Sequence, residues 1–212
     1  MSPVFDFLFE PYQNYLLADI IIEALGVFFG FLSVWYSKQN KIAVFPTGMV
    51  STGLFVYLLW QATLWGDMLI NAYYFLMSIY GWYYWTRKAE DTIQHPISET
   101  TAKEWKTTIW LGLGTVLLVF SVYTLTNRWT VWTAYVDTFT TALFFVGMWL
   151  MAKRKIENWI FWIIGDIISV PLYFYKGLVL TSFQFTLFTA LAIWGYRSWK
   201  HSLDNKPQAA TV

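Results

Sequence analysis

The sequence contains no cysteine and few charged residues. Among its 212 residues, only 13% are Asp, Glu, Lys or Arg, about half of the roughly 25% found in soluble proteins. The lack of cysteine excludes disulfides, thiol nucleophiles and Cys-ligated zinc. The two histidines, His95 and His201, lie far apart in polar stretches, so we expect neither a metal site nor a cofactor. A net charge of +1 leaves no basic surplus for nucleic acid.

Sequence motifs of several enzyme classes are also missing. No HExxH and no GxxxxGK[ST] pattern occurs anywhere in the chain. The sequence therefore lacks the motifs that metalloproteases and nucleotidases need for catalysis. No apolar stretch carries regularly spaced Arg, which excludes a voltage sensor. We therefore expect a protein that is not an enzyme and has no catalytic residues.

Apolar and aromatic residues are abundant. Hydrophobic residues make up 57% of the chain and aromatic residues 22%, and the mean hydropathy is +0.44. Because this character extends along the whole sequence, it leaves no room for a sizeable water-soluble domain. The composition predicts an all-α integral membrane protein in a lipid bilayer.

Seven stretches are long and apolar enough to cross a membrane as helices, which takes about 20 residues each. Barrel strands would alternate in hydrophobicity, and these stretches do not. Residues 1–16 contain Asp6 and Glu10 and no basic residue, so they are predicted to form an interfacial segment rather than a cleavable signal peptide. The predicted spans are residues 17–37, 42–64, 67–86, 107–126, 131–151, 159–175 and 178–199.

Lys and Arg alternate between the two sides of the predicted helices. Twelve of the 14 follow spans one, three, five and seven, and only Arg128 and Lys176 fall on the other side. Because basic loops stay in the cytoplasm, we predict an N-terminus outside and a C-terminus in the cytoplasm. A wrong number of spans would break this alternation, so the charges independently support seven.

Spans one to three resemble spans five to seven at an offset of 114 residues, with a small slip expected in the middle of the repeat. The matches are Glu23 with Asp137, Trp35 with Trp149, Lys41-Ile42 with Lys155-Ile156, Tyr80-Gly81-Trp82 with Trp194-Gly195-Tyr196, and Trp85 with Trp199. The first members lie four spans apart, so both triplets run in the same direction. This predicts a parallel repeat about an axis normal to the membrane, with span four as the linker, as in the SWEET carriers.

Two matching bundles around a central axis suit a carrier that works by alternating access, with its substrate near the midplane. A receptor or a membrane enzyme has no need of such a duplication. The predicted segments are residues 1–16 (interfacial), 17–86 (first three-helix repeat), 87–130 (cytoplasmic loop and linker helix), 131–200 (second three-helix repeat) and 201–212 (cytoplasmic tail).

Span six carries the most informative polar residues. Trp159, Trp162, Asp166, Ser169 and Tyr173 fall within a stripe about 100° wide, at roughly 100° per residue. A polar group that faces lipid is costly, so this stripe is predicted to face the bundle interior. An interfacial belt also explains Trp159, and a hydrogen bond to a neighbouring helix also explains Asp166. We predict that Trp159, Trp162, Asp166 and Tyr173 bind substrate.

Spans three and seven extend the predicted site. Asn71, Ser78 and Trp82 share one face of span three, and Gln184 lies in span seven. Amide side chains suit a ligand amide or sugar hydroxyls, although interhelical hydrogen bonding explains Asn71 and Gln184 equally well. All four are predicted substrate-binding residues.

The predicted lining is aromatic, amide-bearing and acidic. It indicates a ligand with a flat ring to stack on Trp, hydroxyl or amide groups, and a positive charge that cation–π attraction would stabilise. No basic residue lies in the middle of a span, so a phosphorylated ligand fits poorly. In span one, Gly26, Gly30 and Ser33 are interpreted instead as a seam for helix packing.

The second repeat resembles the PnuC family of bacterial nicotinamide riboside transporters. The resemblance is carried by the pattern WLMAxK…ENWxxWxxxD…LYxxKGL between Trp149 and Leu178, and the span layout extends it over residues 17–200. It implies a SWEET-like 3+1+3 fold, usually a homotrimer in the bacterial inner membrane. It also implies facilitated diffusion of nicotinamide riboside, an NAD precursor, which a cytoplasmic kinase then phosphorylates and traps. The family's tryptophan-rich motif maps onto Trp159, Trp162 and Asp166, although some members have Asn in place of Asp166.

Several functions remain open at the level of the sequence. Members of the same family can prefer thiamine or riboflavin, and the motif does not separate these vitamins. A proton-coupled carrier that uses Asp166 or Glu23 is a second possibility. A third is the ligand-capturing subunit of a larger energised importer, although the loops contain no dedicated coupling segment.

Overall fold

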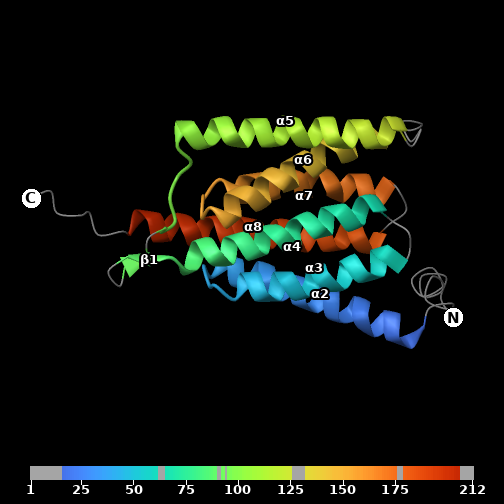
Figure 1. Ribbon diagram of the computed structural model, residues 1–212, viewed down its shortest axis with the longest axis horizontal. Helices are drawn as coiled ribbons and strands as arrows, with labels where there is room; N and C mark the ends of the chain where they lie inside the picture. The colour runs from blue at the N-terminus through green and yellow to red at the C-terminus, as the bar shows by residue number, and fades with distance from the viewer. Residues whose placement is uncertain are drawn as a thin grey trace, which may run out of the picture.

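The computed structural model describes residues 16–61, 65–89, 92–93, 95–125, 132–175 and 179–205. The predicted interfacial segment lies outside these residues, except for Leu16. Within the described residues, the chain forms seven helices and one two-stranded hairpin (Figure 1). They are α2 (Leu17–Lys38), α3 (Val44–Gln61), α4 (Trp65–Thr86), β1 (Lys88–Ala89), β2 (Thr92–Ile93), α5 (Ala102–Leu125), α6 (Thr133–Ala152), α7 (Asn158–Tyr175) and α8 (Val179–Asp204).

The helices lie side by side along the long axis of the molecule (Figure 1). Helices α2, α3 and α4 pack in sequence to form one bundle, and α6, α7 and α8 form a second. The bundles meet where α2 packs on α8 and α4 packs on α6. Helix α5 lies on the outside and packs on α6. The predicted seven-helix 3+1+3 fold is therefore confirmed.

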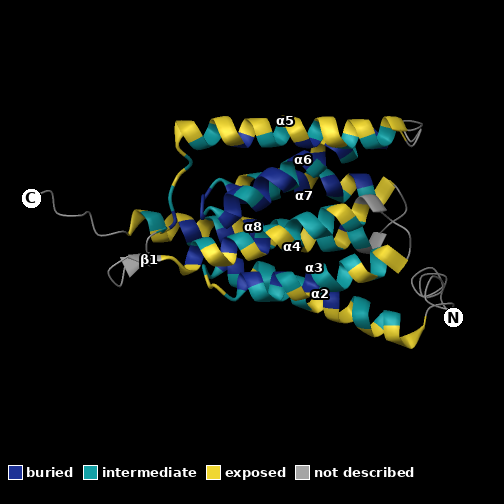
Figure 2. Ribbon diagram, viewed as in Figure 1, coloured by how far each residue is buried: buried dark blue, intermediate teal, exposed yellow. Residues whose placement is uncertain are grey.

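Four described helices, α2, α5, α6 and α7, are long and apolar enough to cross a membrane by length and composition. Helices α3, α4 and α8 reach 18, 22 and 26 residues. They are rich in Tyr, Trp, Ser and Thr, which lowers their mean hydropathy. The apolar residues along α5 remain exposed on its outer face (Figure 2), as expected of a helix that faces lipid.

The two bundles keep one offset through the middle of the repeat. Helices α3 (Val44–Gln61) and α7 (Asn158–Tyr175) differ by 114 residues at both ends, and the starts of α4 and α8, Trp65 and Val179, keep this offset. The slip expected in the middle of the repeat is therefore wrong. The turns that follow α2 and α6 match as well, because Asn40 and Arg154 have φ of 54° and 57°.

Equivalent aromatic residues fill the core of each bundle in the same way. The Phe45 ring lies so close to Gly81 that a side chain at Gly81 would collide with it, and Trp159 lies against Gly195 in the same manner. Phe45 packs edge-on against Trp85, with ring centroids 4.9 Å apart, and the equivalent pair of Trp159 and Trp199 is 5.6 Å apart. These rings form one continuous buried cluster.

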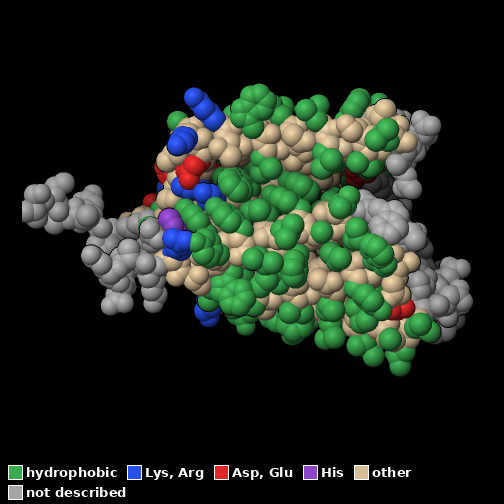
Figure 3. Space-filling model, in the orientation of Figure 1, with side chains coloured by type: hydrophobic (Ala, Val, Ile, Leu, Met, Phe, Trp, Pro, Cys, Tyr) green, Lys and Arg blue, Asp and Glu red, His purple; other side chains and the backbone are tan. Residues whose placement is uncertain are grey.

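One end of the molecule carries the basic residues. In Figure 3, Lys and Arg gather at the end near β1, while hydrophobic side chains cover the length of the helices. We call this the basic end. Helices α2, α4, α6 and α8 finish there and α5 begins there (Figure 1).

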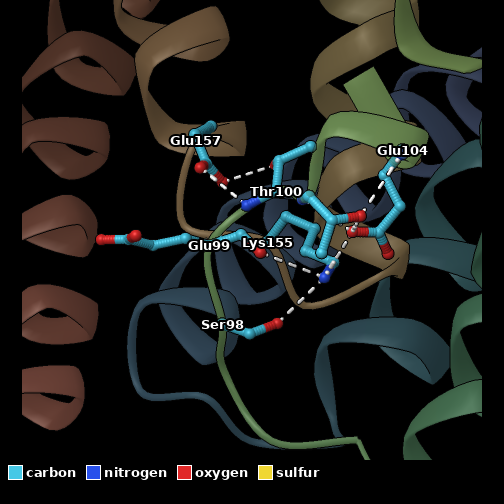
Figure 4. Close-up of polar contacts among 7 residues, drawn as sticks. Ser98, Glu99, Thr100, Glu104, Lys155 and Glu157 are labelled. Carbon is cyan, nitrogen blue, oxygen red and sulfur yellow. Dashed lines mark hydrogen bonds and ion pairs between the residues drawn. The ribbon is translucent and has the colours of Figure 1, made fainter. Parts of the chain in front are cut away.

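A short strap, residues 97–101, joins the hairpin to α5 at the basic end and is held on the turn between α6 and α7 (Figure 4). Ser98 pairs with Lys155 in a parallel bridge. The Thr100 N–H and hydroxyl donate to the Glu157 carboxylate at 2.8 and 2.7 Å. The Lys155 ammonium donates to Ser98 Oγ at 3.0 Å and lies 2.8 Å from Glu104 Oε2. These bonds fix the start of α5 to the second bundle.

Candidate functional site

A cavity of about 300 Å³ lies between the two bundles. This volume falls at the lower end of the range of roughly 300–1,000 Å³ for small-ligand sites. Its lining comes from all six helices of the two repeats, whereas no described residue of α5 takes part. It includes Gly30, Ser33, Val34 and Ser37 (α2), Val44, Gly48, Ser51 and Thr52 (α3), Tyr74 and Ser78 (α4), Phe144, Met148 and Met151 (α6), Trp159, Trp162 and Asp166 (α7), and Phe185, Phe188 and Ala192 (α8).

The two bundles give the cavity two chemically different walls. The first bundle contributes glycines and hydroxyl side chains, and the second contributes mainly large aromatic rings. The difference arises because the small and the large residue exchange places between equivalent helices of the two bundles. In the first bundle Gly48 faces Ser33, whereas in the second Trp162 packs on Gly147. Large rings therefore fill the second side and leave the free volume against the first.

The hydroxyl groups of the first wall are held by backbone bonds. Ser33 Oγ donates to the carbonyl of Val44 at 2.8 Å, Ser51 Oγ donates to that of Gly26 at 2.8 Å, and Ser78 Oγ donates to that of Tyr74 at 2.8 Å. Each of these hydroxyl groups already donates its hydrogen, but the lone pairs of its oxygen can still accept a hydrogen bond. This wall thus offers fixed acceptors for the hydroxyl or amide hydrogens of a ligand.

Trp162 and Asp166 lie one turn apart on α7 and both line the cavity. The Trp162 ring stacks on Phe144, with centroids 5.5 Å apart and planes at 26°, and its centroid lies 6.3 Å from that of Tyr74. Asp166 is only 3% exposed, and no hydrogen bond or ion pair joins it to a described residue. The aromatic wall therefore ends in a buried carboxylate with no protein counterion.

Trp159 forms part of the lining near the basic end. Its ring is 2% exposed and packs edge-on against Trp199. Its indole Nε1–H has no hydrogen-bond partner in the described part of the chain. A buried donor without a partner is costly, so Trp159 offers the cavity the aromatic surface of its ring rather than its N–H.

The structure brings four of the eight predicted site residues together at the cavity: Trp159, Trp162, Asp166 and Ser78. The other four lie outside its lining. Tyr173 stacks on Phe185 with centroids 5.1 Å apart, and the Asn71 amide donates to the carbonyl of Asp67. Trp82 is 43% exposed, and Gln184 is half-buried in α8.

Sequence reasoning missed most of the first wall. Gly30 and Ser33, interpreted as a packing seam, line the cavity. Gly26 does serve packing, because it lies against Phe55. The missed Thr52 stands at the position equivalent to Asp166, so extending the 114-residue offset through the middle of the repeat would have found it.

No three His, Asp or Glu side chains come together as a metal site anywhere in the described residues. The cavity lining likewise contains no Lys, Arg or His. The arrangement therefore suits binding of an organic molecule by stacking, hydroxyl contacts and one carboxylate.

Comparison with known proteins gives consistent matches along the chain. Residues 20–201 match the family model described as nicotinamide mononucleotide transporter. The nicotinamide riboside transporter PnuC of Escherichia coli (strain K12) is 27% identical over 216 residues, which cover 89% of each chain. The riboflavin/roseoflavin transporter RibM of Streptomyces davaonensis is 24% identical, over 92% of this chain and 91% of that protein.

A solved structure also resembles this one. It is the crystal structure of the vitamin B3 transporter PnuC, with a TM-score of 0.66 at 18% sequence identity. The alignment covers 96% of this chain and 91% of that one. At this identity the likeness shows the shared fold.

Proposed function

The chain belongs to the nicotinamide mononucleotide transporter family, to which the PnuC proteins belong, and from this premise we propose that it takes up nicotinamide riboside. It is a multi-pass membrane protein and a transporter rather than an enzyme. The observation that carries the proposal is the cavity between the two bundles, which joins an aromatic wall to a hydroxyl wall and contains one acid.

The chemistry of the cavity matches the parts of nicotinamide riboside. The pyridinium ring is flat and positively charged, which suits stacking on the Trp162 ring and attraction by Asp166. The ribose hydroxyls suit the acceptors on Ser33, Ser51 and other hydroxyl groups of the first wall.

The family model is described by the phosphorylated form, the mononucleotide, but the lining favours the nucleoside. Phosphate sites in proteins use Arg, Lys or backbone N–H groups at helix N-termini. No basic side chain among the described residues lines this cavity, and Asp166 would repel a phosphate. We therefore assign the unphosphorylated nucleoside as the substrate.

Transport would proceed by facilitated diffusion through alternating access, in which the two bundles rock about the cavity. We place the N-terminus outside and the basic end in the cytoplasm, because loops rich in Lys and Arg stay on the cytoplasmic side. A cytoplasmic kinase would trap the imported nucleoside by phosphorylation. The exposed apolar surface of the helices provides area for packing against further copies, and the assembly proposed is a homotrimer in the bacterial inner membrane.

Calorimetric titration of the purified protein in detergent tests this function. We expect nicotinamide riboside to bind and the mononucleotide to bind at least about tenfold more weakly, since the phosphate meets a carboxylate and no base. Equal binding of both forms, or no binding of the nucleoside, would overturn the proposal. Tighter binding of riboflavin would assign the chain to the activity of its RibM relative.

Proteoliposomes test the mechanism. Labelled nicotinamide riboside should exchange down its own gradient with no added energy source. Acceleration by an imposed pH gradient would instead support the proton-coupled alternative that uses Asp166 or Glu23. Co-purification with an ATPase would support a role as the capturing subunit of an energised importer.

A further inference from the structure

We infer that Asp166 makes the cavity selective for a ring with a permanent positive charge, so that charge rather than shape distinguishes the vitamins that this chain accepts. The inference rests on the proposed function and adds the electrostatic character of the substrate. It starts from Asp166, the one charged side chain that the described part of the chain contributes to the lining.

The carboxylate of Asp166 lacks a counterion in the protein. The side chain is 3% exposed, and no ion pair or hydrogen bond joins it to a described residue. The described basic side chains lie at the basic end instead: Lys155 pairs with Glu104, and Arg154 bonds to Asn40 and to the His95 carbonyl. A buried charge without a partner is strongly unfavourable, and a bound cation would remove that penalty.

The geometry places a cationic ring where the carboxylate can neutralise it. Trp162 precedes Asp166 by four residues on α7, so the two side chains occupy the same face about one turn apart. A ring that stacks on the Trp162 indole therefore carries its charge within one helical turn of the carboxylate. Stacking and charge pairing act together on a cation, whereas a neutral ring gains only the stacking.

The opposite wall adds no second charge. Thr52 occupies the position equivalent to Asp166 in the first bundle and also lines the cavity. The lining thus has one acid and one hydroxyl at matched positions, for a net charge of −1 when Asp166 is ionised. A monocation balances this charge, while a neutral isoalloxazine such as that of riboflavin leaves Asp166 unpaired.

The test compares two ligands of the same shape. One is nicotinamide riboside, and the other is its benzamide analogue, in which carbon replaces the ring nitrogen and the positive charge is lost. Calorimetry on the full chain in detergent should give at least about tenfold tighter binding of the cation. In Asp166→Asn, which keeps the shape of the side chain, the two affinities should come within about threefold of each other.

Two further variants separate charge from other effects. Thr52→Val removes a polar group from the cavity without changing its charge, so the ratio of the two affinities should persist. Thr52→Asp in the Asp166→Asn protein returns a carboxylate from the opposite wall and should restore part of the preference.

The outcomes are distinguishable. Equal binding of both ligands by the unmodified protein, or an unchanged ratio in Asp166→Asn, would overturn charge selection and leave uptake of the vitamin intact. Failure of both ligands to bind would overturn the proposed function itself. If Asp166→Asn does not fold, the ratio measured on the unmodified protein still decides.

Discussion

Trp85 and Trp199 occupy the same position in the two repeats, and each donates its indole N–H to the opposite bundle. Trp85 Nε1 donates to the carbonyl of Ala152 on α6 at 3.1 Å, and Trp199 Nε1 donates to the carbonyl of Ser37 on α2 at 2.9 Å. Their ring centroids lie 6.0 Å apart. Each third helix is thereby tied to the first helix of the other bundle, next to the cavity-lining residues Ser37 and Met151.

Loss of one indole N–H should loosen the contact between the two bundles and make the cavity more accessible from the basic end. Trp199→Phe keeps an aromatic ring but removes a hydrogen bond worth about 1 kcal/mol. Because the chain has no native cysteine, Val34→Cys places a single thiol in the cavity. In inside-out vesicles, we expect an impermeant thiol reagent to label that thiol roughly fivefold faster when Trp199→Phe is added.

Trp110→Phe is the matched control, because Trp110 lies on α5 and is 73% exposed. It should leave the labelling rate unchanged. Equal rates in the Trp199→Phe and Trp110→Phe proteins would show that the indole bond does not hold the two bundles together.

The glycines beneath the core rings should not tolerate a methyl group. A Cβ at Gly81 would collide with the Phe45 ring, and one at Gly195 would collide with Trp159. Both rings are at most 2% exposed, so neither can move aside cheaply. We expect Gly81→Ala and Gly195→Ala each to lower the free energy of unfolding by about 1–3 kcal/mol.

Thermal melting in detergent, followed by the fraction that remains monodisperse, measures this loss. Gly114→Ala on α5 is the control, since nothing lies within 4 Å of its Cβ, and alanine favours a helix by up to about 1 kcal/mol over glycine. A Gly81→Ala protein as stable as Gly114→Ala would contradict the packing described.

The number of helices and their pairing were predictable because they depend on properties written locally in the chain. Apolar length defines a span, and the Lys41-Ile42 and Lys155-Ile156 match showed the repeat. The expected slip was wrong because the middle of the repeat differs most in chemistry. In that stretch Gly48 and Thr52 occupy the positions equivalent to Trp162 and Asp166. These pairs differ so much in chemistry that the sequence does not reveal the constant offset, although the helices keep it.

The site was only half predictable, because periodicity gives the face of a helix and not the depth of a cavity. Tyr173 shares the stripe of Asp166 but lies seven residues further along, about 10 Å away at 1.5 Å per residue. Asn71 bears the same relation to Ser78. The prediction for Gln184 was wrong in the face of the helix rather than in the depth. Its neighbour Phe185 lines the cavity, and successive side chains on a helix point about 100° apart.

Lys155 should contribute to the stability of the fold, whereas Lys41, at the equivalent position of the first repeat, should not. Lys155 bonds to the strap and to Glu104, and its side chain is 8% exposed, whereas Lys41 is exposed. Lys155→Met leaves Glu104 and Ser98 Oγ without this partner, so we expect a loss of roughly 1–3 kcal/mol. Lys41→Met should change the melting temperature by less than a quarter as much, and equal losses would contradict a specific role for the strap.

His95 should remain neutral to a lower pH than an ordinary histidine. Its ring stacks on Tyr84 at 3.8 Å. Burial, followed by the charges of Lys153 and the nearby arginines, lowers its pKa below the usual 6.5. Because the unfolded chain then binds more protons as the pH falls below about 6.5, the contribution of His95 to stability is present above that pH and is lost below it.

Nuclear magnetic resonance on His201→Gln protein, in which His95 is the remaining histidine, measures this pKa directly. Lys153→Met in that background removes one of the cations and should raise the value toward 6.5. A pKa at or above the ordinary value in the parent protein, or no change with Lys153→Met, would contradict the arrangement of charges around the ring.

Trp162 and Asn71 give the sharpest separation between a residue in the cavity and one outside it. Both were predicted from the sequence to bind substrate, but only Trp162 lines the cavity, while the Asn71 amide is bonded to the Asp67 carbonyl within α4. Trp162→Ala removes the ring on which we propose that the ligand stacks, and it should weaken binding of nicotinamide riboside by about 1–3 kcal/mol, roughly 5- to 150-fold. Asn71→Ala should leave the affinity within twofold, since its amide is used inside its own helix. Calorimetry on both variants measures the two affinities. Weaker binding by Asn71→Ala and unchanged binding by Trp162→Ala would move the site about two helical turns along α4, away from the carboxylate of Asp166.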